Sequence, residues 1–182
     1  IDNVNGLLPM LSQTGQLTMA EQLGRASLAV ARNLPGLDPV IFADALANLA
    51  TVMGVEGNLS ESFRLFNELE AKAAELPAEP LFVHSLNAGQ IYLEHGLLSD
   101  AERYLSKARQ ISESNEFEPY LMMGIFNALG RLAADSGDPN ASIRWHEEAL
   151  SILKEHGFES ELLHAIIVDN IGLAFATKQC FR

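Results

Sequence analysis

The side chains of this 182-residue chain that could do chemistry are five histidines and one cysteine. They form no H-E-x-x-H zinc motif, and the sequence has neither a nucleophile elbow nor a glycine-rich phosphate loop. Glu161 and His164 have the E-x-x-H spacing of carboxylate-bridged metal helices. Such a site needs a second E-x-x-H and further glutamates on facing helices, and the motif is not repeated. We therefore predict no metal, no cofactor and no catalytic activity.

Composition and charge limit the kinds of partner. Hydrophobic residues make up 48% of the chain, which suffices for one sizeable core or one elongated solenoid. The 24 acidic and 12 basic residues give a net charge of -12, which repels nucleic-acid phosphates. No apolar run reaches the roughly 20 residues that span a bilayer, and the first residues do not resemble a signal peptide. With a single cysteine, we expect a cytoplasmic protein without nucleic-acid or membrane partners.

Small residues recur with a period of about 40 residues and indicate pairs of helices. Glycines suited to tight turns occur once in each period, at Gly15, Gly57, Gly96 and Gly137. Small residues suited to close helix contacts keep the same period, at Ala50, Gly89, Gly130 and Gly172. Acid-proline pairs keep it as well, at Asp38-Pro39, Glu79-Pro80 and Glu118-Pro119. We interpret each period as a helix, a glycine turn and a second helix.

Capping residues predict where these helices begin and end. In the acid-proline pairs the acid would cap the helix and proline would take the first helical position. Residues with an acid three positions later predict further helix starts, at Thr18, Asn58 and Ser99, with Asp138 acting likewise. Left-handed helix ends are predicted at Gly36, Asn115 and Gly157. The expected helices are Pro9–Gln13, Thr18–Asn33, Pro39–Gly54, Leu59–Leu76, Pro80–His95, Ser99–Asn115, Pro119–Ser136, Pro139–His156 and Ser160–Lys178.

These helices divide one domain, residues 1–182, into repeats. The expected boundaries are about 1–37, 38–78, 79–117 and 118–158, followed by a half-repeat at 159–182. A solenoid normally ends in a polar capping helix, whereas this half-repeat is apolar. The next turn is expected at Gln179–Phe181. We therefore interpret the chain as a fragment of a longer protein.

The repeated residues resemble the tetratricopeptide repeat (TPR) family. The second unit shows the pattern at Leu46, Leu49, Ala50, Met53, Gly57, Leu59, Ser62, Phe66 and Leu69. The third shows it at Gly89, Tyr92, Gly96, Ala101 and Ala108, and the fourth at Leu129, Gly130, Gly137, Trp145 and Ala149. The units are longer than the usual TPR, which resembles kinesin light chains and MalT-like or peptide-sensing bacterial regulators. The resemblance implies an all-α, right-handed superhelical solenoid of antiparallel helix pairs, about four repeats plus one helix. It also implies a buried packing role for His146 and an outer-layer position for Trp145.

The resemblance also implies that the first helices line a concave groove, and asparagines recur on these helices. Asn48, Asn87 and Asn170 lie two residues before a small residue of the repeat, and Asn127 lies beside the fourth equivalent position, Ala128. This recurrence resembles the asparagine ladder with which TPR grooves hold an extended peptide. A carboxamide offers both a donor and an acceptor, as a peptide bond does. The alternative is that these asparagines solvate the helix surface or bond to the neighbouring repeat.

Further groove candidates follow at helical spacing. They are Asp44 and Thr51, then Leu86, Gln90 and Glu94, then Arg131 and Asp135, and finally Asp169 and Leu173. Four of these side chains are acidic and one is basic, which favours a partner segment that carries Lys or Arg. The alternative is that the charges only solvate an open face. The basic clamp with which some TPR proteins hold a C-terminal carboxylate is missing, which disfavours an acidic tail.

Three functions are compatible with these features. The first is a protein-interaction scaffold that binds an extended peptide or a partner helix in the groove. The second is a sensory or regulatory module of a larger signalling or transcription-regulator protein. The third is an architectural solenoid that self-associates through its exposed ends.

Overall fold

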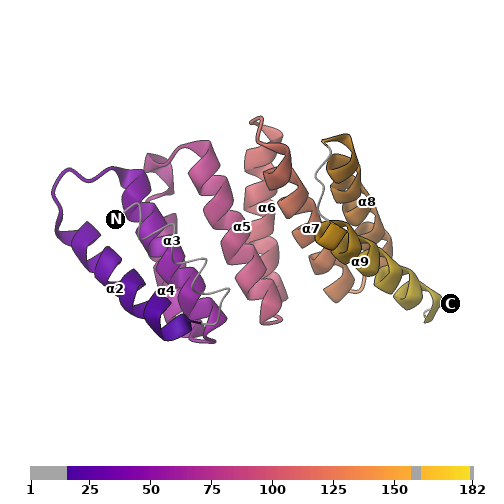
Figure 1. Cartoon of the computed structure of the whole chain (residues 1–182), viewed down its shortest axis with the longest axis horizontal. Coiled ribbons are helices and arrows are strands. Elements are labelled where there is room, and N and C mark those ends of the chain that lie inside the picture. Colours follow the sequence, from indigo (N-terminus) through magenta and orange to yellow (C-terminus); the bar gives the residue numbers. More distant parts are fainter. Residues whose placement is uncertain (1–15, 157–160, 181–182) are drawn as a thin grey trace. The chain divides into compact units, whose positions relative to one another are not determined.

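The computed structural model describes residues 16–156 and 161–180. Within these residues the secondary structure is helical and contains no strand (Figure 1). The predicted helix at Pro9–Gln13 and the predicted turns at Gly15 and Gly157 lie outside the described residues. The helices are α2 (Leu17–Asn33), α3 (Pro39–Val55), α4 (Leu59–Glu70), the 3₁₀ helix η1 (Ala73–Glu75), α5 (Ala78–Glu94), α6 (Leu98–Glu113), α7 (Pro119–Asp135), α8 (Pro139–Glu155) and α9 (Glu161–Cys180).

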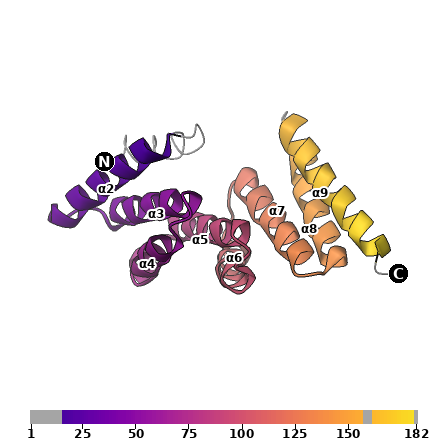
Figure 2. The same cartoon turned by 90° about the horizontal axis from the view of Figure 1, so that it is seen from below.

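The chain forms two compact units, residues 1–91 and 92–182, with the division inside α5. In the first unit α3 packs on α4, and α2 packs on α3. In the second unit α7 packs on α8 and α8 packs on α9, as Figure 2 shows. Consecutive helices joined by short turns run antiparallel. The predicted helix pairs α3–α4 and α7–α8 are therefore confirmed.

Three turns have the same backbone geometry, and a glycine makes each of them. Gly57, Gly96 and Gly137 have φ angles of 81°, 70° and 81°, in the left-handed region that residues with a Cβ disfavour. The amide after each glycine bonds to a carbonyl five residues earlier, for example Asn58 N to Met53 O at 2.8 Å. This is the Schellman arrangement of a helix C-terminus. The turns predicted from the glycine period are confirmed.

Some predicted caps are confirmed and others are wrong. The side chains of Asp38, Asn58 and Asp138 accept hydrogen bonds from the amides of Val40, Glu61 and Ala141. The remaining predicted caps make no such bond. Thr18 and Ser99 lie inside α2 and α6, α5 begins at Ala78 ahead of Glu79, Glu118 makes no side-chain cap bond, and Asn115 has no positive φ.

The turn geometry explains which caps failed. The residue directly after each turn glycine is the N-cap of the next helix, whether it is Asn58, Leu97 or Asp138. The geometry of the Schellman turn determines which residue is the N-cap, whatever side chain that residue carries. Ser99 has a capping side chain, but it follows Leu97 by two residues and so lies within the helix. A capping side chain therefore stabilises the start of the helix but does not determine where the helix starts.

Two helix ends also differ from the prediction. The expected helix Leu59–Leu76 ends at Glu70 and is followed by η1. Leu76 is extended, as the steric demands of the following Pro77 require. At the other end of the chain, Gln179 and Cys180 belong to α9, although a turn was expected there.

The cores are built where helices of a pair meet. In the first unit the fully buried side chains include Leu46 and Met53 of α3 and Phe66 of α4. The hydroxyl of Ser62 on α4 donates to the Ala50 carbonyl of α3 at 2.8 Å, which satisfies a polar group at this close contact.

In the second unit, aromatic rings fill the space between helices. His146 is 1% exposed, as predicted, and its ring lies against Gly130 of α7. A Cβ built on Gly130 would lie 2.6 Å from the His146 ring, so only glycine fits there without a shift. Trp145 stacks on Phe126 with ring centres 5.7 Å apart, and the Arg109 guanidinium of α6 lies 5.1 Å from the indole centre.

Candidate functional site

The first unit carries four of the predicted groove residues, Asn48 on α3 and Leu86, Asn87 and Gln90 on α5. The three polar side chains are half-buried. Leu86 retains only 6% of its surface and belongs to the core, so it offers a ligand almost no contact area. Leu86 was predicted from helical spacing alone, and the spacing could not separate a groove position from the adjacent core position.

Asp44, another predicted groove residue of α3, lies beside a histidine that the sequence did not single out. The His84 Nε2 atom lies 3.3 Å from the Asp44 Oδ1 atom, but neither ring nitrogen makes a hydrogen bond of good geometry in the described structure. His84 is 5% exposed, whereas the Asp44 side chain is 39% exposed. A protonated His84 would form an ion pair with Asp44. The signal for this contact was available, because His84 follows Asp44 by one repeat period.

Thr51, one helical turn beyond the Asn48 position on α3, has a local partner. Its hydroxyl donates to the Ala47 carbonyl four residues earlier at 2.9 Å. Such back-bonding is common for threonine inside a helix and occupies the only hydroxyl donor. Thr51 can therefore only accept a hydrogen bond from a ligand.

In the second unit the structure brings two of the predicted asparagines together. The Asn170 amide of α9 donates to the Asn127 carbonyl oxygen of α7 at 3.3 Å, in a partly buried environment. Asn170 corresponds to Ala128 of the preceding repeat, so Asn127 lies one position before the matching place on α7. The contact bonds one repeat to the next, as the alternative interpretation of these asparagines expects. A carboxamide carries two donor hydrogens and two lone pairs, so each side chain retains hydrogen-bonding capacity after this contact.

The charged candidates of the second unit lie on α7, on α9 and at the end of α5. Arg131 follows Asn127 by one helical turn and is half-buried, and Asp135 follows by a second turn and is exposed. Asp169 on α9 and Glu94 at the end of α5 are also exposed. Burial, and then the positive charge of Arg131, lower the pKa of His146 from its ordinary value. His146 is therefore neutral near pH 7 and acts as a packing ring behind the Arg131 face of α7.

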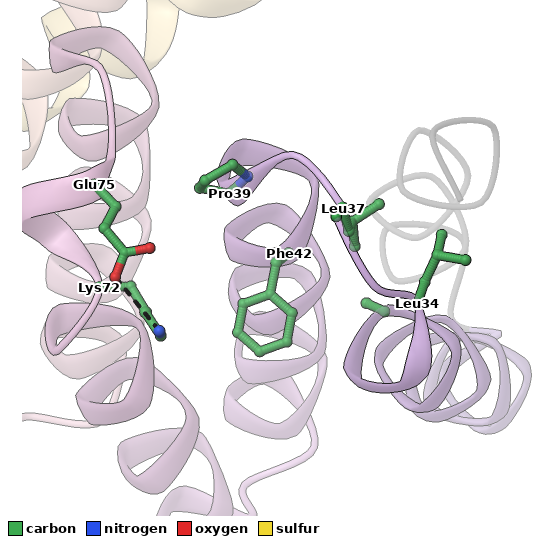
Figure 3. A pocket seen from close by; sticks show the side chains of 8 residues that line it. Leu34, Leu37, Pro39, Phe42, Lys72 and Glu75 are labelled. Atoms are coloured by element: carbon green, nitrogen blue, oxygen red, sulfur yellow. Dashed lines mark hydrogen bonds and ion pairs between the residues drawn. The ribbon is translucent and has the colours of Figure 1, made fainter.

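A separate pocket of about 250 Å³ lies in the first unit (Figure 3). The Phe42 ring faces it from α3, with Leu34 and Leu37 on one side and the Lys72–Glu75 ion pair (3.4 Å) on the other. The pocket is smaller than the roughly 300–1,000 Å³ of small-molecule sites. It therefore suits one apolar side chain. The sequence analysis missed it, although leucines in the short connection between α2 and α3 were a signal.

Membrane spans and metal clusters are two further classes of site. None of the helices in the part of the chain that the structure describes combines the length and the low polarity that crossing a bilayer requires. Among the same described residues, the histidine, cysteine, aspartate and glutamate side chains form no cluster of three or more that could hold a metal ion.

Comparison with known proteins defines the fold. No protein-family model and no curated protein matches the sequence. Among solved structures, the chain is similar to the crystal structure of BtubC (BKLC) from P. vanneervenii, with a TM-score of 0.79 and 20% identity. The match covers 98% of this chain and 72% of that one. The chain therefore has an all-α, TPR-like fold of antiparallel helix pairs, as its repeat pattern predicted.

Proposed function

We propose that this chain is a non-catalytic protein-interaction module that binds an extended peptide along its first helices. The observation that carries the proposal is that Asn127 and Asn170 lie together on successive first helices and each retain hydrogen-bonding capacity after the bond between them. Donors and acceptors on the neighbouring helices α7 and α9 suit a ligand backbone that repeats its own donors and acceptors. The TPR-like fold supports an interaction role in general.

The remaining capacity of the two carboxamides favours main-chain recognition. After the contact between them, Asn127 keeps its amide donors and Asn170 keeps its carbonyl acceptor. Each hydrogen bond to a ligand contributes about 0.5–1.5 kcal/mol net. Several such bonds give useful affinity without selecting the ligand's side chains, so selectivity has to come from charge.

The charge of the candidate residues favours a basic partner. Asp44, Glu94, Asp135 and Asp169 are at least partly exposed, and Arg131 is the single cation among the groove candidates. The chain as a whole, including these residues, has a net charge of -12. A peptide with Lys or Arg would be attracted and oriented by this field, and salt would weaken its binding.

An array of immobilised extended peptides, identical in length and differing in charge, tests the proposal. The intact chain is expected to bind basic peptides more strongly than neutral ones and acidic peptides least. The double variant Asn87→Ala, Asn127→Ala is expected to lose roughly tenfold in affinity or more, because a main-chain partner is removed in each unit.

The matched control is Asn140→Ala, which removes an exposed asparagine from α8, a second helix. This variant should bind as the parent chain does. Circular dichroism establishes that all three proteins are equally helical. Equal peptide affinity in the double variant and the control would refute a role for the first-helix asparagines.

A further inference from the structure

A buried histidine of α5 lies beside a carboxylate of α3. The His84 side chain keeps 5% of its surface, and its Nε2 atom lies 3.3 Å from the Asp44 Oδ1 atom. Within the described residues, neither ring nitrogen has a hydrogen-bond partner, although both are shielded from solvent. Most buried polar atoms in proteins are bonded. The imidazole is therefore an unsatisfied group whose contacts one proton can change.

A proton on this ring supplies a donor and a charge that Asp44 can balance. A neutral imidazole has a single N–H, so its Nε2 atom can face the carboxylate as a lone pair. A protonated imidazole has an N–H on both nitrogens. From the separation of 3.3 Å, a small rotation of either side chain then gives a charge-assisted hydrogen bond between Nε2 and Oδ1.

The other charges of the first unit are engaged elsewhere. Among the described residues of this unit, Asp44 is the charged group in ion-pair range of His84. Asp38 and Glu56 cap the two ends of α3, and Glu79 is exposed at the start of α5. The ion pairs that join α2 to α4, or lie in α4 and η1, are Arg25–Glu61, Arg32–Glu68, Arg64–Glu68 and Lys72–Glu75. The charge state of His84 is therefore felt mainly by Asp44.

The contact joins two successive first helices close to the groove candidates. Asp44 lies four residues before Asn48 on α3, and His84 lies three residues before Asn87 on α5. Each is therefore about one helical turn from an asparagine on its own helix. A bond between Asp44 and His84 would fix the distance between α3 and α5 near these asparagines. Protonation of histidine is a general way in which pH changes such contacts.

We propose that His84 and Asp44 form a pH-dependent latch, a contact between α3 and α5 that one proton makes or breaks. The latch is open while the ring is neutral. Protonation closes it, because the ring then donates to the carboxylate. The latch acts in the chain without any ligand. It therefore goes beyond peptide binding, and its failure would leave that proposal standing.

Nuclear magnetic resonance of the intact chain between pH 8 and 5, the range in which histidines change charge, tests the latch. The carboxyl carbon signal of Asp44 is expected to move in step with the ring signals of His84, in addition to any step from its own protonation. His84→Gln should remove this step, because glutamine gains no proton. An Asp44 signal that ignores the titration of His84 would overturn the proposal.

Hydrogen exchange measures whether the contact holds the helices together. Amides of α3 and α5, corrected for the intrinsic pH dependence of exchange, are expected to exchange about twofold to fivefold more slowly when the latch closes. Asp44→Asn and His84→Gln should each abolish the change, because each leaves one partner without a charge. Slowing that persists in both variants would show that another group joins the helices.

The matched control is His164→Gln, which replaces an exposed histidine of α9 in the second unit. It should keep both the Asp44 step and the slower exchange. Circular dichroism should show equal helix content in the parent chain and all three variants. If the control removes the Asp44 step, or if His84→Gln keeps it, His84 is not the group that closes the latch.

Discussion

The two units hold their outer helices in place with different chemistry. In the first unit, Arg25 and Arg32 of α2 bond to Glu61 and Glu68 of α4, at distances of 2.7–2.8 Å. In the second unit the outer helix α8 is held by rings, with Trp145 on Phe126 and His146 on Gly130. The two units therefore share the positions at which their helices meet but differ in the interactions that hold the helices together.

The difference follows from the spacing of the residues involved. Arg25 and Arg32 are seven residues apart on α2, as Glu61 and Glu68 are on α4, so two equivalent ion pairs form two helical turns apart. Arg64 lies between the two acids at 3.4 Å from each. These side chains are partly exposed, so water and salt weaken the pairs. The ring contacts of Trp145 and His146 in the second unit are more buried, and their stability depends on how closely the rings fit against α7.

The largest expected difference comes from one substitution made at two equivalent glycines. Gly130→Ala forces a Cβ against the His146 ring, whereas Gly172→Ala places one in open space. The gain in helix propensity is the same at both sites and cancels. Urea unfolding should therefore show Gly130→Ala to be less stable than Gly172→Ala by about 1–3 kcal/mol. Equal stability would mean that the His146 ring moves aside without cost.

Acidification should destabilise the second unit before the first. Burial, and then the charge of Arg131, lower the pKa of His146, so below about pH 6.5 the unfolded chain binds a proton that the folded chain resists. Stability contributed by a neutral His146 is full above that pH and falls as pH decreases, by at most about 1.4 kcal/mol per pH unit. Urea unfolding between pH 7.5 and 5.5 measures the slope. His146→Gln should flatten it, and an unchanged slope in that variant would exclude His146 as its source.

The first unit should lose stability at lower pH. Hydrogen bonding to Arg25 holds the pKa of Glu61 below its ordinary value of about 4.3. The stability from this ion pair is present above that value and is lost as pH falls through the lowered pKa. Hydrogen exchange of α4 amides, corrected for the intrinsic pH dependence, is expected to rise only in this lower range. A rise in the range of the His146 step would contradict the assignment.

The smallest expected effect is the coupling between Arg25 and Glu61. The Arg25 side chain is 43% exposed, so solvent screening limits the pair to about 0.5 kcal/mol despite its two short bonds. A double-mutant cycle with Arg25→Ala and Glu61→Ala in urea unfolding measures this coupling. It should shrink in about 1 M salt, where the screening length is near 3 Å. A coupling that salt leaves unchanged would show that packing, not charge, joins α2 to α4.

Much of the fold was predictable because glycine, which has no Cβ, readily adopts the positive φ angles that end a helix in a tight turn. Gly57, Gly96 and Gly137 take positive φ angles, and each turn then places the next N-cap one residue later. The failed caps show the limit of this reasoning. Ser99 has a side chain suited to capping, but the turn at Gly96 makes Leu97 the N-cap residue of α6. Ser99 therefore lies inside the helix.

The candidate site was only partly predictable from the sequence. Asn127 and Asn170 were named from the repeat pattern, and the structure brings them into contact. Leu86 was named by the same spacing and lies in the core. His84 was not named, although it lies 3.3 Å from Asp44. Within one helical turn, a groove position and a core position can be adjacent residues. Because the repeat period varies from unit to unit, spacing alone cannot predict which of the two faces the groove.

The sequence by itself determined the helix pairs and the glycine turns within them, because glycine, proline and apolar spacing act on the local backbone. The tertiary structure decided which side chains meet between helices: Arg25 with Glu61, His146 with Gly130 and Asn170 with Asn127. These contacts join residues on different helices, and packing geometry alone selects them among many pairs of similar spacing.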